Sequence, residues 1–160
     1  MEHRWLSPEQ QRAWRRFIAA VQLLPHDLDH DMRKSFDLSM HEYWVLAMLS
    51  EHEDRSMRMQ ELARRSTSTA SRLSHTISRL IERGLVVKER EGQDKRGQRA
   101  ILTDAGFDLI VKAAPRHADM VLQLIFDSLT DEQVAQMSQI FDQVLERLDP
   151  SGERSPGGRI

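Results

Sequence analysis

Apolar residues recur every three or four positions along most of this chain, a spacing that predicts a largely helical protein. The first helix is expected to begin at residues 7–10, where Ser, Pro, Glu and Gln form a capping sequence. Its apolar stripe extends to Leu24. Pro25 is expected to kink or interrupt this helix, which then resumes as far as Lys34.

The central part of the chain predicts three further helices. A capping box at residues 39–42 begins the first, and the other two are expected at residues 58–65 and 67–83. Gly84 is expected to end the last one, because glycine readily adopts the left-handed conformation found at helix C-termini. A short helix, a tight turn and a second helix together have the spacing of a helix-turn-helix.

Alternation with a period of two replaces the helical period after Gly84. One strand is expected to begin at Leu85, and a second at residues 99–103. A charged turn at residues 92–97 joins them. This hairpin predicts a two-stranded wing beside the helix-turn-helix.

The C-terminal third is expected to be helical again. Thr103 and Asp104 begin a long helix that Pro115 should bend, and residues 130–133 form one more capping box. Apolar residues in the final helix form a seam suited to packing along another helix: Val134, Met137, Phe141, Val144 and Leu148.

Charge is segregated along the chain, although the total is nearly neutral. Residues 55–99 hold 12 basic and 5 acidic side chains, a net charge of +7. The remaining residues hold 11 basic and 20 acidic side chains, a net charge of −9. A basic segment in an otherwise acidic protein is the pattern expected for contact with nucleic-acid phosphates.

The helix expected at residues 67–83 has an apolar side and a polar side. The apolar side consists of Ala70, Leu73, Ile77, Leu80 and Ile81. The polar side carries groups that hydrogen-bond to base edges and phosphates: Ser68, Thr69, Ser71, Arg72, His75 and Arg79. Because no acidic residue precedes Glu82 on this side, we expect the helix to enter the major groove of double-stranded DNA.

The turn of the expected hairpin is basic and lies between two glycines. A turn of this kind can enter a minor groove, where arginine is attracted by the concentrated negative potential. Asp94 is expected to hold the Arg96 guanidinium by a charge-assisted hydrogen bond. With Arg90 and Lys95, this pair makes up the predicted wing contacts.

Residues 79–106 resemble a known family. The sequence ERGLV at residues 82–86, the wing pattern from Asp94 and Arg96 to Leu102-Thr103, and the continuation to Gly106 are similar to the MarR family of winged helix-turn-helix regulators. With the order of elements, the resemblance covers roughly residues 5–148.

This resemblance implies a fold class that is mainly α with a small β-wing (α+β), a winged helix-turn-helix with N- and C-terminal dimerisation helices. The implied parts are a dimerisation helix at 1–38, a DNA-binding domain at 39–103, dimerisation helices at 104–149 and a disordered tail at 150–160. The resemblance also implies a homodimer on a pseudo-palindromic operator, and repression that is relieved by a small, often aromatic, ligand.

Two groups of residues are candidates for a sensor. Four aromatic residues are candidates to line a ligand pocket, although such residues more often belong to a core: Trp14, Phe17, Tyr43 and Trp44. His26 and His30 share a helix face at a spacing that suits a divalent metal, but the sequence places no third ligand, and a polar helix surface is the alternative. The sequence implies no other cofactor, and the lack of cysteine excludes a thiol switch.

Several other classes are disfavoured. The chain has no glycine-rich phosphate loop, nucleophile elbow or paired carboxylates in an apolar context, so no catalytic activity is predicted. No apolar run approaches the ~20 residues of a membrane helix, and the N-terminus lacks a signal peptide's apolar core, so a cytoplasmic location is expected. Three alternatives stay open: a ligand-independent architectural or anti-repressor DNA-binding protein, a metal-responsive regulator, and a helical dimer whose basic face binds a protein.

Overall fold

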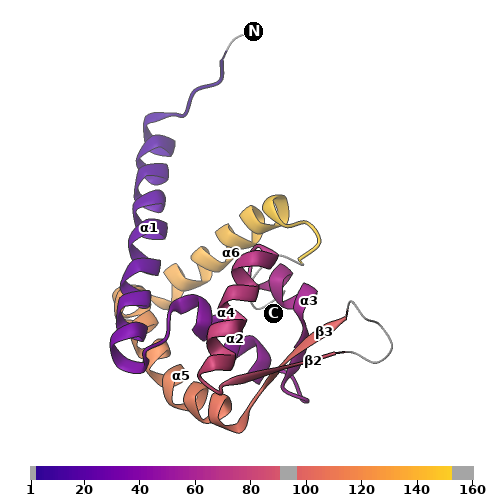
Figure 1. The fold of residues 1–160 in the computed structure, drawn as a ribbon. Coiled ribbons are helices and arrows are strands. Elements are labelled where there is room, and N and C mark those ends of the chain that lie inside the picture. The colour runs from indigo at the N-terminus through magenta and orange to yellow at the C-terminus, as the bar shows by residue number, and fades with distance from the viewer. Residues whose placement is uncertain (1–2, 91–96, 153–160) are drawn as a thin grey trace.

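The computed structural model describes residues 3–90 and 97–152. Helices and strands follow in the order α1 (Pro8–Phe36), α2 (Met40–Ser50), β1 (Ser56–Arg58), α3 (Met59–Arg65), α4 (Ala70–Glu82), β2 (Val86–Arg90), β3 (Gln98–Leu102), α5 (Asp104–Leu124), the 3₁₀ helix η1 (Phe126–Ser128) and α6 (Asp131–Leu148). The mainly helical winged fold is therefore confirmed (Figure 1). Within these ranges, no helix is long and apolar enough to cross a membrane.

Short polar side chains fix where the helices begin. The three capping boxes expected at residues 7–10, 39–42 and 130–133 are all present. Thr103 caps α5, where its Oγ1 accepts a hydrogen bond from the Gly106 amide at 3.0 Å. Each cap satisfies amide groups that have no partner inside the helix, and these four predicted helix starts are confirmed.

Of the kink or interruption expected at Pro25, the interruption is wrong, because α1 is one continuous helix. Proline removes one amide donor and so leaves the carbonyl of Val21 without its usual helical partner. Both residues are exposed, so water is available to that carbonyl. Pro115 likewise lies inside the continuous helix α5.

The wing has three strands rather than the two expected. Their order is β1-β3-β2, and both pairings are antiparallel, with Ser56 opposite Ile101 and Val86 opposite Leu102. β1 has only three residues, too few for alternation to be visible in the sequence. The helix expected from Arg58 therefore begins one residue later, at α3.

The core lies between α2, α4, the sheet and the start of α5. Its fully buried side chains include Leu46, Leu49, Leu62, Leu73, Ile77, Leu80 and Val86. Figure 1 shows the N-terminal part of α1 extending away from this core. None of the described residues of α6 is buried, and only Asp31 and Met32 are buried in α1.

One buried ion pair holds the C-terminal part of α1 to α5. Arg116 Nε donates to Asp31 Oδ2 at 2.9 Å, and a second hydrogen bond joins Nη2 to Oδ1. This bonding lowers the pKa of the Asp31 carboxyl below its ordinary value. The pair joins residues that lie 85 positions apart along the chain.

Replacing Gly106 by alanine is expected to lower the free energy of unfolding by about 3 kcal/mol, because the core has no room for a methyl group there. A Cβ at this position would overlap the backbone carbonyl oxygen of Leu85 and approach Leu102 Cδ1 to 2.6 Å. Urea denaturation measures the effect. Gly84→Ala is the matched control: its φ of +69° strains an alanine, but nothing lies within 4 Å of the added carbon, so a loss of only about 1 kcal/mol is expected. Equal losses for the two variants would contradict this prediction.

Candidate nucleic-acid interface

A helix-turn-helix is formed by α3, the turn at residues 66–69, and α4. The turn is closed by backbone hydrogen bonds from Thr67 to Arg64 at 3.2 Å and from Ser68 to Ala63 at 3.0 Å. Thr67 has a φ of +48°, a conformation that β-branched residues rarely adopt. The helix expected from residue 67 therefore begins only at Ala70, after Thr69 has capped it.

Helix α4 presents one polar face outward. Leu73, Ile77 and Leu80 of the predicted apolar side are buried, whereas Ala70 and Ile81 of the same side are exposed. These two residues lie at the ends of the helix, beyond the part that packs on the core. The exposed face instead carries Ser71, Arg72, Ser74, His75, Ser78 and Arg79.

Two of the predicted DNA-contacting hydroxyl groups have partners within the protein. Thr69 Oγ1 accepts a hydrogen bond from the Arg72 amide at 3.2 Å as the N-cap of α4. Ser68 Oγ lies 3.1 Å from Nε2 of His41, in α2. Burial lowers the pKa of His41, and the charge of Arg72 lowers it further against the opposing charge of Glu42. These contacts fix the start of α4.

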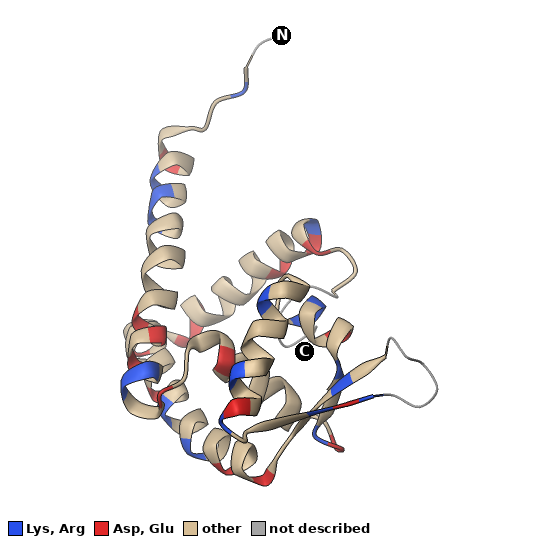
Figure 2. Ribbon diagram, viewed as in Figure 1, with Lys and Arg blue, Asp and Glu red and all other residues tan. Residues whose placement is uncertain are grey.

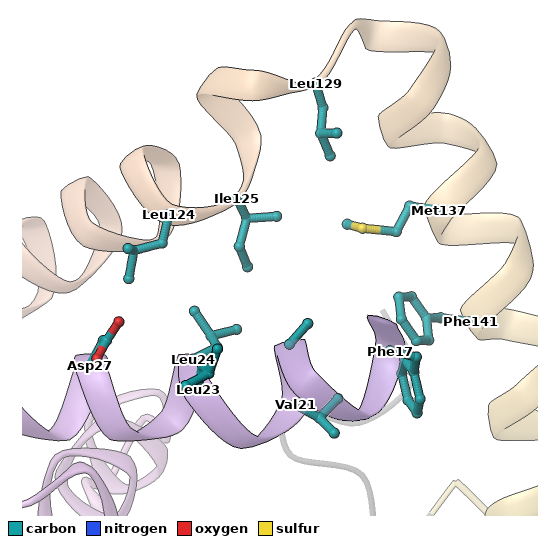
Figure 3. Close-up of a pocket in the computed structure, with 11 residues that line it drawn as sticks. Phe17, Val21, Leu23, Leu24, Asp27, Leu124, Ile125, Leu129, Met137 and Phe141 are labelled. Carbon is teal, nitrogen blue, oxygen red and sulfur yellow. The ribbon is translucent and has the colours of Figure 1, made fainter. Parts of the chain in front are cut away.

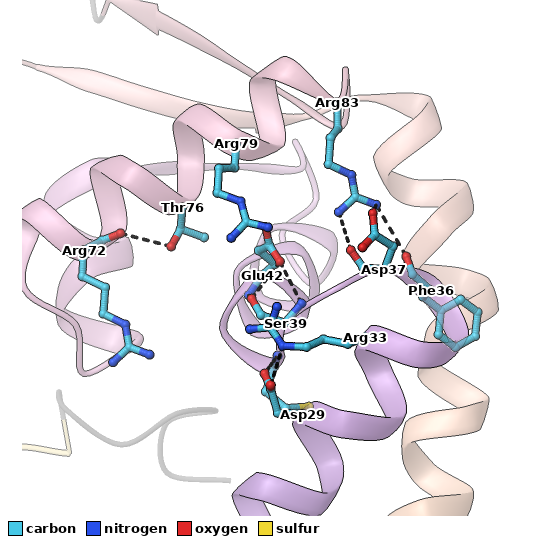
Figure 4. A network of polar contacts seen from close by, with 11 residues as sticks. Asp29, Arg33, Phe36, Asp37, Ser39, Glu42, Arg72, Thr76, Arg79 and Arg83 are labelled. Carbon is cyan, nitrogen blue, oxygen red and sulfur yellow. Dashed lines mark hydrogen bonds and ion pairs between the residues drawn. The ribbon is translucent and has the colours of Figure 1, made fainter.

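Two arginines of the C-terminal part of the helix-turn-helix are also held by the protein (Figure 4). Arg79 Nη2 lies 3.3 Å from Oε1 of Glu42, a side chain that is only 1% exposed. Arg83 Nη1 donates to the backbone carbonyl of Asp37 at 2.7 Å. Both contacts point toward the α1–α2 junction.

Three other basic side chains are available to bind a ligand. Among the described residues, Arg72, Lys88 and Arg90 form no side-chain hydrogen bond or ion pair with the rest of the protein. Figure 4 shows the Arg72 guanidinium directed away from the Glu42 network. Figure 2 shows basic residues along α4 and the β2–β3 hairpin, whereas the charges on α6 are mainly acidic. Arg72 is thus the guanidinium of α4 that is free to bind a ligand.

The hairpin positions Arg90 at the end of β2. The predicted turn residues Asp94, Lys95 and Arg96 lie outside the described residues. At the other edge of the hairpin, Arg99 Nη2 donates to Asp54 Oδ2 at 2.9 Å, so this arginine stabilises the sheet.

The four aromatic residues considered for a pocket fall into two clusters. Trp14 and Phe17 lie with their ring centroids 6.1 Å apart, and Phe17 is 6.0 Å from Phe141 of α6. Tyr43 and Trp44 instead surround His117 of α5, with centroid distances of 4.6 and 5.6 Å. Burial lowers the pKa of His117, and its Nδ1 has no hydrogen-bond partner among the described residues.

A cavity of about 480 Å³ lies between α1, the end of α5 and α6 (Figure 3). Asp27 is the one charged residue in its lining. The other lining residues are Phe17, Ala20, Val21, Leu23, Leu24, Leu124, Ile125, Leu129, Met137 and Phe141. Of the four aromatic candidates, only Phe17 lines it.

The histidine pair shows no sign of a metal centre in the described part of the chain. His26 Nδ1 lies 3.2 Å from Oδ1 of its neighbour Asp27. Among residues 3–90 and 97–152, no three His, Asp or Glu side chains are grouped so that they could hold a metal ion.

Three residues of this region were not recognised from the sequence: His41, Glu42 and Arg83. The capping box identified Glu42 as a helix cap. Its sequence pattern does not indicate that Glu42 is buried or that it pairs with Arg79, 37 positions away along the chain. Contacts of this kind depend on how helices pack, which the periodicity of each helix does not specify.

Known proteins resemble both the sequence and the fold. The family model described as MarR family matches residues 36–97. Sco3205, a MarR family transcriptional regulator from Streptomyces coelicolor solved in complex with DNA, is 43% identical, with 94% of each chain covered and a TM-score of 0.88. AbsC, another MarR family transcriptional regulator from Streptomyces coelicolor, is 36% identical, with 93% of this chain and 100% of that chain covered and a TM-score of 0.86.

A more distant structure shares only the fold. The complex of MepR from S. aureus with DNA is 20% identical to this chain, with 82% of this chain and 94% of that chain covered and a TM-score of 0.73. No curated protein matches the chain.

Proposed function

The chain belongs to the MarR family of transcriptional regulators, and from this premise we propose that it is a homodimeric, sequence-specific DNA-binding repressor that a small ligand releases from its operator. In this proposal residues 39–103 bind DNA, and residues 1–38 and 104–149 form the dimer.

The outward face of α4 carries this proposal. It offers hydroxyl, imidazole and guanidinium donors, and the guanidinium of Arg72 has no ion-pair partner among the described residues. Arginine recognises guanine through two hydrogen bonds in the major groove. Ser71 and His75, exposed on the same face, are the proposed companions of Arg72. The complex of Sco3205 with DNA supports this assignment by similarity.

The wing is proposed to add contacts beside the major groove. Arg90 stands at the end of β2, where the chain enters the predicted turn with Asp94, Lys95 and Arg96. Arginine in a minor groove responds to groove width and potential rather than to base edges. The wing would therefore add affinity, and α4 would add most of the sequence specificity.

Dimer formation is proposed from the uncovered apolar faces of α1 and α6. Trp14, Leu23, Leu145 and Leu148 are between 43% and 65% exposed, and α6 has no buried residue within the described chain. Large apolar surfaces of this kind mark interaction sites in soluble proteins. A second copy that pairs its own α1 and α6 with these faces would cover them.

The effector is proposed to be small and largely apolar. The cavity between α1 and α6 has a volume typical of ligand sites, and aromatic and aliphatic side chains dominate its lining. The cluster of Tyr43, Trp44 and His117 is a second place where an aromatic ligand could bind.

Selection from a pool of random-sequence duplexes is expected to enrich pseudo-palindromic DNA. Affinity for the enriched duplex should fall by about a thousandfold or more between roughly 50 and 200 mM salt, because each contacted phosphate releases counterions. The sequences of the selected pool show the enrichment, and fluorescence anisotropy measures the affinity at each salt concentration. No enrichment would contradict the proposal, and binding that is insensitive to salt would favour a protein partner for the basic face.

A further inference from the structure

Glu42 lies outside the proposed DNA-contacting face, yet it forms an ion pair with Arg79 of α4, the proposed recognition helix. We propose that Glu42 is a positioning residue for DNA recognition: through Arg79 it sets the orientation of α4 relative to α2 and α1. The inference rests on the proposed DNA-binding function and assigns Arg79 to a contact with Glu42 rather than to a contact with DNA.

The Glu42 carboxylate has two oxygens with different roles. Oε2 accepts hydrogen bonds from the Ser39 amide and the Ser39 hydroxyl, both at 2.7 Å, and so completes the cap of α2. Oε1 is buried and accepts no hydrogen bond from the described residues. Its ion-pair partner is Arg79, at 3.3 Å. Because a buried carboxylate without a counter-ion is strongly destabilising, the position of Arg79 is constrained by Glu42.

Arg79 lies about two turns beyond Arg72 on α4, and its side chain is 46% exposed. Although it lies on the exposed face of the helix, its guanidinium turns toward the protein, as Figure 4 shows. It thus fastens the C-terminal half of α4 to α2, while the contact of Ser68 with His41 joins the turn before α4 to α2.

Further contacts extend this attachment to α1. The Met40 amide donates to Asp29 Oδ1 at 2.8 Å, so the start of α2 is bonded directly to α1. Arg33 donates to Oδ2 of the same carboxylate at 2.6 Å and also interacts electrostatically with Glu42. Arg83, just after α4, donates to the carbonyl of Asp37 at the C-terminal end of α1.

A chain of polar contacts therefore joins the proposed dimerisation helix to the recognition helix. A small rotation of α1 would move Asp29, Met40 and the capped start of α2, and with it the carboxylate that holds Arg79. The distance between the two recognition helices of a dimer must match the helical repeat of DNA. Loss of the Glu42–Arg79 pair should therefore reduce binding to the specific site more than binding to arbitrary DNA.

Glu42→Gln tests this inference with little disturbance of the cap, because glutamine also serves at this position of a capping box. The wild type, E42Q, R79Q and the double variant are compared on the duplex that the wild type selects and on a scrambled duplex of equal length. Each single variant is expected to lower the ratio of the two affinities about tenfold. The double variant should lose no more than either single variant, because both break one pair.

The salt dependence of R79Q distinguishes a positioning residue from a phosphate contact. A positioning role leaves the slope of log affinity against log salt unchanged, whereas loss of a phosphate contact reduces it by about 0.9 for each contact. Asp104→Asn is the matched control: it breaks the ion pair with Arg55, which involves none of α1, α2 and α4, so the affinity ratio should stay within about twofold.

A ratio unchanged in E42Q, additive losses in the double variant or a reduced slope in R79Q would each overturn the inference while leaving the proposed function standing. If the wild type selects no duplex, the proposed function and the inference fail together. Nuclear magnetic resonance of the Arg79 Nε–H group checks the pair without DNA: the proton should exchange slowly with water in the wild type and quickly in E42Q. Equal exchange rates would overturn the inference independently.

Discussion

Deletion of residues 130–160 is expected to abolish the dimer and to lower operator affinity by at least about a thousandfold. The deletion removes α6, an 18-residue helix. None of its residues is buried within the described chain, so its apolar stripe is left exposed. A monomer can occupy only one half-site, and it loses the gain in effective concentration that links the two halves. Binding should then fall to the level of nonspecific DNA association.

Analytical ultracentrifugation and gel-shift titration measure the two losses. Because a truncated chain could aggregate through its exposed α1 face, a single substitution provides the sharper test. Val144 is 38% exposed in the middle of the α6 stripe, and Val144→Glu would place an unpaired charge in the interface, which costs several kcal/mol. Gln139→Glu adds the same charge on the opposite side of α6 and should leave the dimer intact. A stable dimer after either the deletion or V144E would refute the assigned interface.

Much of this fold could be predicted from local sequence, because caps and periodicity are local properties. The Ser39–Glu42 box and the Thr103 cap placed two helix starts correctly, and Gly84 marked the end of α4. The strand β1 was missed because its pairing with β3 depends on a distant part of the chain. The interruption expected at Pro25 is wrong for a local reason, since the exposed carbonyl of Val21 is accessible to water.

In the candidate site, too, some features could be predicted from local sequence and others depend on packing. The sequence located the outward face of α4, since that face follows from helical spacing and charge. It could not separate Arg72 from Arg79, because the two have the same chemistry and lie on the same side of the helix. The difference between them is the carboxylate of Glu42, which is brought beside Arg79 only by the packing of α2 on α4.

Arg72→Ala is expected to lower operator affinity about a hundredfold and to relax the preference at one base pair in each half-site. A bidentate arginine–guanine contact contributes about 1–3 kcal/mol, and a dimer makes it twice, so about 1.4 kcal/mol at each half-site gives this factor. The side chain is exposed and forms no hydrogen bond or ion pair with other described residues, so its removal should leave folding unchanged.

Affinities for duplexes that carry every single-base change in the selected site measure both effects. Arg72→Lys keeps the charge but not the planar pair of donors, so it should restore nonspecific affinity and not the base preference. Arg90→Ala and Arg96→Ala are the contrasting variants, since wing contacts should weaken binding to all sequences and reduce the salt slope.

The comparison of these variants decides which arginine recognises sequence. If R72A lowers affinity equally for every duplex, its guanidinium binds phosphate, and base recognition passes to Ser71 and His75 on the same exposed face. If instead R79Q relaxes a base preference while R72A does not, Arg79 leaves Glu42 when DNA binds. The buried carboxylate would then lose its ion-pair partner in the complex, which is energetically costly. The ion pair in the free protein therefore favours Arg72 as the residue that recognises sequence.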